Sequence, residues 1–192
     1  MTLGTRWLHL LVVTVLLLAA LGPVPEAQAA GTSFYVTTTR DLNTSPPACD
    51  GSLPPSGTAC SLRQAIQKAN AASNQNNPVT IRFKIPPDPS EPGYKPIAGG
   101  TTWTISPTLP LPAISASYIS LDGTTQVEFI GGNPNVLGPE IILDGSNPGV
   151  TSGGLTILAN ATNCTIKGLG IVKFRDGIAG VQIDGDNNYI YG

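Results

Sequence analysis

Hydrophobic and polar residues alternate in several stretches of the chain, and this alternation predicts strands. Residues 79–85 (VTIRFKI) carry an apolar side chain at every second position, which is typical of a strand buried on one face. Residues 33–41 (SFYVTTTRD) are rich in aromatic and β-branched residues and also indicate a strand. Between residues 86 and 112 the chain is rich in Pro and Gly, and only residues 101–105 (TTWTI) have strand character.

One segment has the pattern of a helix instead. Residues 60–70 read CSLRQAIQKAN, in which Ser61 and Gln64 form the S-x-x-Q pattern of a capping box. The apolar positions recur at helical spacing and fall on one face: Leu62, Ala65, Ile66 and Ala69. Pro78 prevents the helix from continuing. We therefore expect a short amphipathic helix that covers an apolar surface.

After residue 113 the chain consists of short apolar segments broken by Gly, Asp and Asn, and these segments recur. The sequence LDGT at 121–124 returns as LDGS at 143–146, and NCTIKG at 163–168 returns as NNYIYG at 187–192. Ile157 and Ile183 occupy matching places at a similar spacing. A repeat of about two dozen residues made of short strands and turns predicts an all-β solenoid, whose coils stack on one another. An antiparallel sandwich predicts no such recurrence, and the consensus of leucine-rich repeats is missing.

The first coil of a solenoid would expose unpaired backbone groups and an apolar interior. We expect the helix to plug this end, held by a disulfide between Cys49 and Cys60. A zinc site is the alternative for these two thiols, but no histidine lies near them. Cys164 lies in an apolar strand pattern and is expected to be a buried free thiol.

The N-terminus reads as a secretory signal peptide. Arg6 precedes an apolar run at 10–21, and the small residues of AQA follow, which places cleavage after Ala29. A retained membrane anchor is the alternative, although the apolar run is shorter than the roughly 20 residues that span a bilayer. The sequence thus divides into a signal peptide (1–29), an N-terminal cap (30–112) and the first coils (113–192), and we expect a secreted or cell-surface protein with no membrane contact after cleavage.

Composition excludes several classes of function. Charged residues make up 11% of the chain and the net charge is −2, so the basic surface that nucleic acids require is missing. The one histidine, His9, lies in the predicted signal peptide. The mature chain therefore has no Ser-His-Asp triad, Cys-His pair or HExxH zinc motif.

Several segments together resemble the N-terminal region of secreted bacterial right-handed parallel β-helix repeat proteins that carry a Cys-Ser-Leu-Arg-Glu/Gln-Ala segment. These segments are, in order, CSLRQAIQKAN, VTIRFKIP, PLPAIS, YISLDGTTQ, IILDGS, GLTI and TIKGLGIVKF. Gln64 stands where such sequences often have Glu. The resemblance implies a right-handed parallel β-helix in an extracellular setting, and it implies that the chain is the start of a longer protein, truncated in mid-repeat. It implies no single activity.

The candidate chemistry consists of a few carboxylates and one mixed-charge cluster. Asp122, Asp144, Asp184 and Asp186 each come after a strand in a D-G or D-G-D context, where Asp and Gly serve turn geometry. Asp184 and Asp186 are also candidate Ca²⁺ ligands, although the loop pattern of a dozen residues is missing. Arg175 and Asp176 are candidates for contact with a uronic acid, or form an exposed ion pair. We expect no catalytic residue, no metal ligand and no cofactor other than this Ca²⁺.

Two hypotheses for function follow. The first is a structural or adhesive protein, without catalysis in this stretch, that contacts extracellular polysaccharide or cell-surface material. The second is the N-terminal part of a polysaccharide lyase or glycoside hydrolase, similar to pectate lyases, with its active site on later coils.

Overall fold

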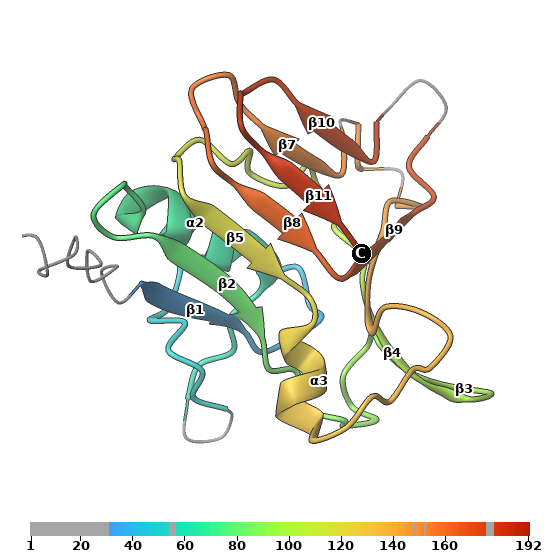
Figure 1. The fold of residues 1–192 in the computed structure, drawn as a ribbon. Coiled ribbons are helices and arrows are strands. Elements are labelled where there is room, and N and C mark those ends of the chain that lie inside the picture. Colours follow the sequence, from blue (N-terminus) through green and yellow to red (C-terminus); the bar gives the residue numbers. More distant parts are fainter. Residues whose placement is uncertain (1–30, 54–56, 148, 152, 176–178) are drawn as a thin grey trace, which may run out of the picture.

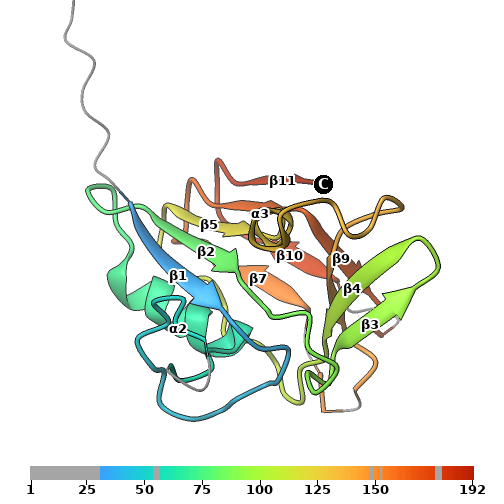
Figure 2. The ribbon, with the colours of Figure 1, turned by 90° about the horizontal axis from the view of Figure 1, so that it is seen from below.

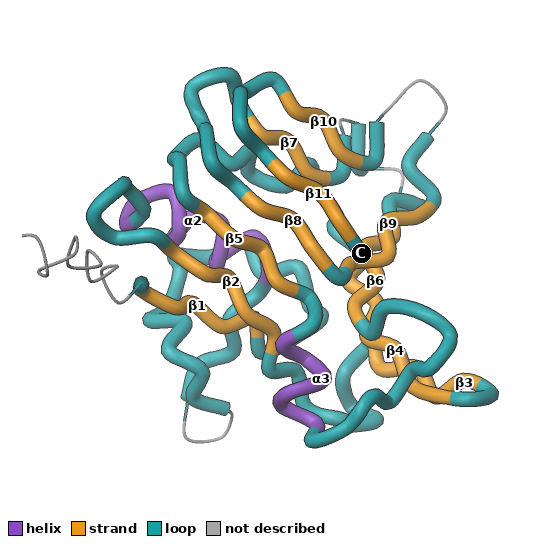
Figure 3. Tube along the Cα trace, viewed as in Figure 1, coloured by secondary structure: helices purple, strands orange, loops and turns teal. Residues whose placement is uncertain are grey.

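The computed structural model describes residues 31–53, 57–147, 149–151, 153–175 and 179–192, and this part of the chain is mostly strands (Figures 1 and 3). The predicted signal peptide and Asp176 lie outside the described residues. The strands are β1 (Thr32–Val36), β2 (Val79–Phe83), β3 (Tyr94–Ile97), β4 (Gly100–Ile105), β5 (Ile119–Asp122), β6 (Ile141–Asp144), β7 (Leu155–Ile157), β8 (Thr165–Lys167), β9 (Leu169–Val172), β10 (Val181–Ile183) and β11 (Tyr189–Tyr191). The helices are α2 (Leu62–Ala72) and α3 (Thr125–Ile130). Neither described helix has the length and apolar character needed to cross a bilayer.

The strands form three sheets. The five-stranded sheet has the order β1-β2-β5-β8-β11, and all its neighbouring strands are parallel. The four-stranded sheet has the order β3-β4-β6-β9 and is parallel except for the β3–β4 hairpin. The two-stranded sheet pairs β7 with β10, and a parallel bridge joins Ile114 to Ile157 beside it. Parallel pairing therefore dominates, which requires strands that are far apart in the sequence to become neighbours.

The chain visits the three sheets repeatedly in the same order. From β4 it passes the bridge at Ile114 and then enters β5; it continues through β6, β7 and β8, and then through β9, β10 and β11. From β4 onward, consecutive strands thus lie in different sheets, and each strand from β6 onward pairs with the strand or bridge of the previous passage in the same sheet (Figure 1).

Two of the predicted recurrences are confirmed as strand pairs and one is wrong. Thr165 pairs with Tyr189, and Ile157 pairs with Ile183, as the recurring segments predict. The two LDG segments do not stack, because the first ends β5 in the five-stranded sheet and the second ends β6 in the four-stranded sheet. They resemble each other because both strands end in the same kind of turn.

The core is built from the alternate residues that point between the sheets. Ile81, Leu121 and Ile166 lie side by side on β2, β5 and β8, and each is at most 1% exposed. Ile190 continues this row on β11 and is 48% exposed, because no described strand lies beyond it. Each strand is therefore buried largely by its neighbour, at roughly 1.5–3 kcal/mol for a fully buried aliphatic side chain.

Helix α2 has the features expected from the sequence. The Ser61 side chain accepts a hydrogen bond from the Gln64 backbone N–H, and the Gln64 side chain accepts one from the Ser61 backbone N–H, which confirms the capping box. The predicted apolar face is buried against β1 and β2, on the inner side of the five-stranded sheet (Figure 2). The helix begins at Leu62, one residue after its cap.

Polar side chains of α2 also bond to the backbone of residues 109–118. Arg63 donates to the carbonyl groups of residues 109 and 110, at 2.8 and 2.7 Å. Asn70 donates to the carbonyl of residue 113 and accepts from the N–H of residue 115. Ser73 donates to the carbonyl of residue 117. The helix thus satisfies backbone groups of this segment for which a neighbouring strand would otherwise be needed.

The cysteines pair as expected. Cys49 and Cys60 form a disulfide with a Cα–Cα distance of 5.4 Å. Cys164 is buried as a free thiol, and burial raises its pKa.

The predicted boundary at residue 113 is not a break in the sheets. Strands β2 and β4 lie before it, yet they pair with β5 and β6 after it. One apolar core includes side chains from both sides of the boundary.

Candidate functional site

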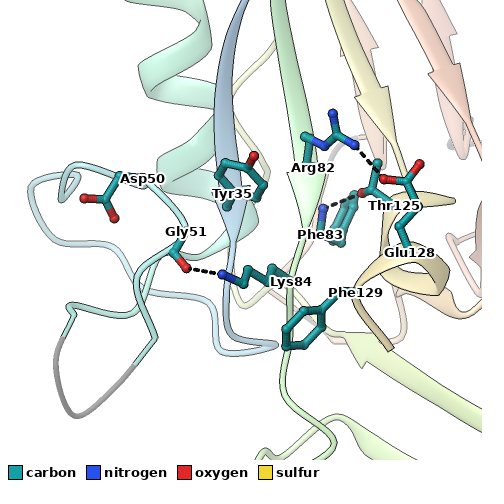
Figure 4. A pocket seen from close by; sticks show the side chains of 9 residues that line it. All are labelled: Tyr35, Asp50, Gly51, Arg82, Phe83, Lys84, Thr125, Glu128 and Phe129. Atoms are coloured by element: carbon teal, nitrogen blue, oxygen red, sulfur yellow. Dashed lines mark hydrogen bonds and ion pairs between the residues drawn. The ribbon is translucent and has the colours of Figure 1, made fainter. Parts of the chain in front are cut away.

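A groove of about 430 Å³ lies on the outer side of β1 and β2 (Figure 4). Its walls come from the two strands, from the disulfide loop and from α3. The lining residues are Tyr35, Asp50, Gly51, Arg82, Phe83, Lys84, Thr125, Glu128 and Phe129.

Strand alternation places the side chains in this groove. Val36 and Phe83 point into the core, so Tyr35 and Arg82 point outward. Tyr35 and Arg82 are direct partners in the β1–β2 register. The Arg82 guanidinium turns away from the Tyr35 ring toward Glu128 on α3 (Figure 4). Lys84 follows two residues after Arg82 and lies on the same outer side.

Helix α3 is attached to the end of β2 by two buried polar side chains. Thr125 accepts a hydrogen bond from the Phe83 N–H at 2.7 Å. The Gln126 amide accepts from the Ile85 N–H at 3.0 Å and donates to the Ile85 carbonyl at 2.7 Å. Gln126 therefore bonds to Ile85 as a neighbouring strand would, and this attachment holds the rest of α3 beside the groove.

Two cationic side chains are anchored in the groove. Arg82 Nη2 lies 2.6 Å from Glu128 Oε2, in an ion pair that is partly open to solvent. Lys84 Nζ donates to the Gly51 carbonyl at 3.0 Å and lies 5.8 Å from the centre of the Phe129 ring. A cation at this distance from an aromatic ring is attracted by the negative face of the ring.

The disulfide loop forms the remaining wall. Gly51 has φ +86°, a left-handed conformation that favours glycine, and a Cβ there would lie 3.0 Å from the Tyr35 ring. Asp50, beside it, accepts a hydrogen bond from the Ser52 N–H, and this bond lowers its pKa. Asp50 is thus an anionic group at neutral pH.

These features suit binding better than proton transfer. A general acid needs a carboxyl group whose pKa is raised toward the working pH, and sugar hydrolysis needs two carboxyl groups in one groove. Here Asp50 has a lowered pKa, and Glu128 is paired with Arg82. The aromatic rings and hydrogen-bonding groups are instead of the kind that contacts a polar ligand.

The carboxylates of the first two turns have structural roles, as the turn interpretation predicts. Asp122 accepts from the Thr124 N–H at 3.1 Å and pairs with Lys167 at 2.8 Å. Asp144 accepts from the N–H of residue 146 and pairs with Lys173 at 2.9 Å. Burial would raise the pKa of Asp144, but the hydrogen bonds from Lys173 and residue 146 lower it overall.

The other candidates lie away from the groove. Asp184 and Asp186 are exposed, and Asp184 accepts hydrogen bonds from the Gln182 amide. Arg175 is exposed beyond β9. Within the described ranges, no three His, Cys, Asp or Glu side chains gather into a group that could hold a metal ion. The Ca²⁺ expectation therefore has no assembled ligand set among these residues.

The groove itself was missed from the sequence. The alternation of residues 79–85 identifies Arg82 and Lys84 as outward residues, but they look like ordinary solvent-exposed positions. The contacts that make a groove come from Gly51 and Phe129, at distant positions in the chain. Searches with this chain against protein-family models, curated proteins and solved structures gave no match. The site must therefore be interpreted from its own geometry.

Proposed function

We propose that this protein is a secreted or cell-surface right-handed parallel β-helix that acts as a structural or adhesive module and contacts carbohydrate without catalysis. The observation that carries the architecture is the repeated passage of the chain through three sheets in one order, with parallel pairing between passages. The strong preference of parallel crossover connections for the right hand supports a right-handed coil.

The role of α2 as a plug is part of the same proposal. The helix buries its apolar face against the first strands, and its polar side chains bond to the backbone of residues 109–118. A helix placed in this way covers a sheet end that would otherwise pair with another chain.

An extracellular setting is supported by the disulfide between Cys49 and Cys60. Such bonds persist in oxidising compartments and are rare in the cytosol of most organisms. The N-terminal segment, which has the pattern of a signal peptide, also supports export.

Carbohydrate contact is supported by the chemistry of the groove. Tyr35 and Phe129 provide aromatic rings, and Arg82 and Lys84 provide hydrogen-bond donors beside them. Rings that stack and donors that bond to hydroxyl groups are the combination that a sugar requires.

The test is affinity electrophoresis of the mature protein through gels that contain soluble polysaccharides. We expect retardation by at least one polysaccharide, and weaker retardation for Phe129→Ala. Tyr118→Ala is the control, because Tyr118 is a partly buried tyrosine outside the groove. The absence of retardation by every polysaccharide would refute the carbohydrate role. Release of unsaturated products from pectate, followed by absorbance in the presence of Ca²⁺, would refute the non-catalytic role.

A further inference from the structure

The outer face of the five-stranded sheet carries two rows of polar side chains that cross the strands. Because the strands are parallel and paired in register, one residue of each strand stands beside its counterpart on the next. The first, the hydroxyl row, consists of Ser33, Thr80, Ser120, Thr165 and Tyr189. The second, the charged row, consists of Tyr35, Arg82, Asp122, Lys167 and Tyr191.

The hydroxyl row is free to bond to a ligand. All five side chains are partly or largely exposed, and none makes a side-chain hydrogen bond to another described residue. Neighbouring strands are about 4.8 Å apart, so the row presents a hydroxyl group at this interval across the sheet. This face is turned toward the reader in Figure 1, and no described helix or strand covers it.

Both cations of the charged row are paired with carboxylates. Lys167 pairs with Asp122 at 2.8 Å, and this hydrogen bond raises the pKa of the lysine. Arg82 pairs with Glu128, which α3 brings to the edge of the same face. An anionic ligand along the two rows would have to compete with these carboxylates for Arg82 and Lys167, whereas an uncharged ligand would not. Lys84 lies beyond the end of both rows, where it donates to the Gly51 carbonyl.

Aromatic rings stand at both ends of the face. Tyr189 and Tyr191 on β11 are 60% and 57% exposed, and Tyr35 lies at the opposite edge, in the groove described above. Exposed tyrosines supply flat apolar surfaces together with a hydroxyl group. A chain of sugar rings along the hydroxyl row would meet the Tyr189 ring at the β11 end and hydroxyl groups on the other strands. At the β1 end it would meet Ser33, and Tyr35 lies two residues further along the same strand, in the charged row.

We propose that the outer face of the five-stranded sheet binds one chain of a neutral polysaccharide, which lies across the strands along the hydroxyl row. This inference rests on the proposed function and specifies its ligand class and its binding face. It replaces the uronic acid considered for Arg175 by an uncharged, hydroxyl-rich polymer.

The test is calorimetric titration of the mature protein with glucose hexamers of β-1,4, β-1,3 and α-1,4 linkage, and with a galacturonate hexamer. The variant Thr80→Val/Thr165→Val removes two hydroxyl groups of the row and retains the β-branched shape. Thr156→Val is the matched control, because Thr156 is an outward threonine on β7 in the two-stranded sheet. Thermal unfolding of each variant verifies that it folds.

We expect at least one glucose hexamer to bind, the double variant to bind it about tenfold or more weakly, and Thr156→Val to bind it as the wild type does. Two lost hydrogen bonds account for a change of this size. Equal binding by the double variant would overturn the assigned face. Tighter and salt-sensitive binding of the galacturonate hexamer would overturn the neutral ligand class and leave the carbohydrate role standing. Binding of none of the four hexamers would overturn this inference alone, and the proposed carbohydrate role would then be decided by the affinity electrophoresis described above.

Discussion

Replacement of Arg63 by methionine should strongly destabilise the fold. The guanidinium group makes two hydrogen bonds to the Asp41 carboxylate, at 2.8 and 2.9 Å, and two more to the carbonyl groups of Leu109 and Pro110. The two side chains are only 6% and 4% exposed. Arg63→Met would leave a buried carboxylate without its counter-ion, so the free energy of unfolding should fall by roughly 3–5 kcal/mol.

The measurement is urea unfolding at pH 7 followed by the fluorescence of Trp103, the one tryptophan outside the predicted signal peptide, which is buried in the core. Arg40→Met is the control, because Arg40 is an exposed arginine in the same segment as Asp41 and its side chain forms no ion pair with a described residue. It should change stability by less than about 0.5 kcal/mol. Equal midpoints for the two variants would refute the role given to the buried pair.

The pH dependence of the same difference is a further check. Burial alone would raise the pKa of Asp41, but hydrogen bonds from Arg63 and Thr108 and the positive charge of Arg63 bring it below the ordinary value of 3.8. A carboxylate with a lowered folded-state pKa contributes stability above its unfolded pKa and loses it as the pH falls through the folded value. The gap between wild type and Arg63→Met should therefore be largest at neutral pH and shrink below about pH 3.8. A gap that stays constant down to pH 2 would contradict this reasoning.

Three further changes test other parts of the structure. Cys49→Ser/Cys60→Ser opens a loop with a sequence separation of 11, so urea unfolding should show a loss of about 3 kcal/mol; wild-type stability would argue against the bridge as a staple. Gly51→Ala forces a side chain into a left-handed conformation and against the Tyr35 ring. We expect the free energy of unfolding to fall by about 1–2 kcal/mol and sugar binding in calorimetry to weaken. An unchanged melting temperature would refute the strain. Gln126→Met leaves the backbone N–H and carbonyl of Ile85 unpaired and should lower the free energy of unfolding by about 2–4 kcal/mol. Gln67→Met removes a buried oxygen that has no partner among the described residues, so it should be neutral or stabilising. The reverse order of stability in chemical denaturation would contradict this comparison.

Local features of the fold could be predicted because their causes are local. The capping box at Ser61 and Gln64 needs only residues three positions apart, and the alternation of residues 79–85 fixes which side of the strand is buried. The disulfide closes a short loop, so it could be proposed from spacing and compartment. The Asp-Gly turns after β5 and β6 were also recognisable, because Asp accepts from its own backbone two residues on.

Pairing between strands could not be predicted as reliably, because it depends on the length and structure of the segments that separate the strands in the sequence. Ser120 pairs with Thr165, far along the chain, since α3 and the loop after it are inserted in that passage. The regular repeat therefore holds only for the last strands, and the similarity of the two LDG segments gave a wrong register. The hairpin of β3 with β4 was missed because its first strand, at 94–97, contains a proline in an irregular stretch.

The groove and the two rows depend on the same long-range pairing. Ser33 and Tyr189 belong to one row only because three strands lie between them in register. A single outward serine or threonine gives no signal in the sequence, since such residues are common on any strand.

The parallel register of the five-stranded sheet is the basis of both the architecture and the proposed binding face, and electron paramagnetic resonance tests it most directly. Spin labels placed on the outer face at Thr80→Cys and Thr165→Cys stand two strand spacings apart, at roughly 10 Å between backbones. We predict strong dipolar broadening for the doubly labelled protein relative to the two single-label samples. A spectrum equal to the sum of the single-label spectra would contradict the register and the binding face built on it.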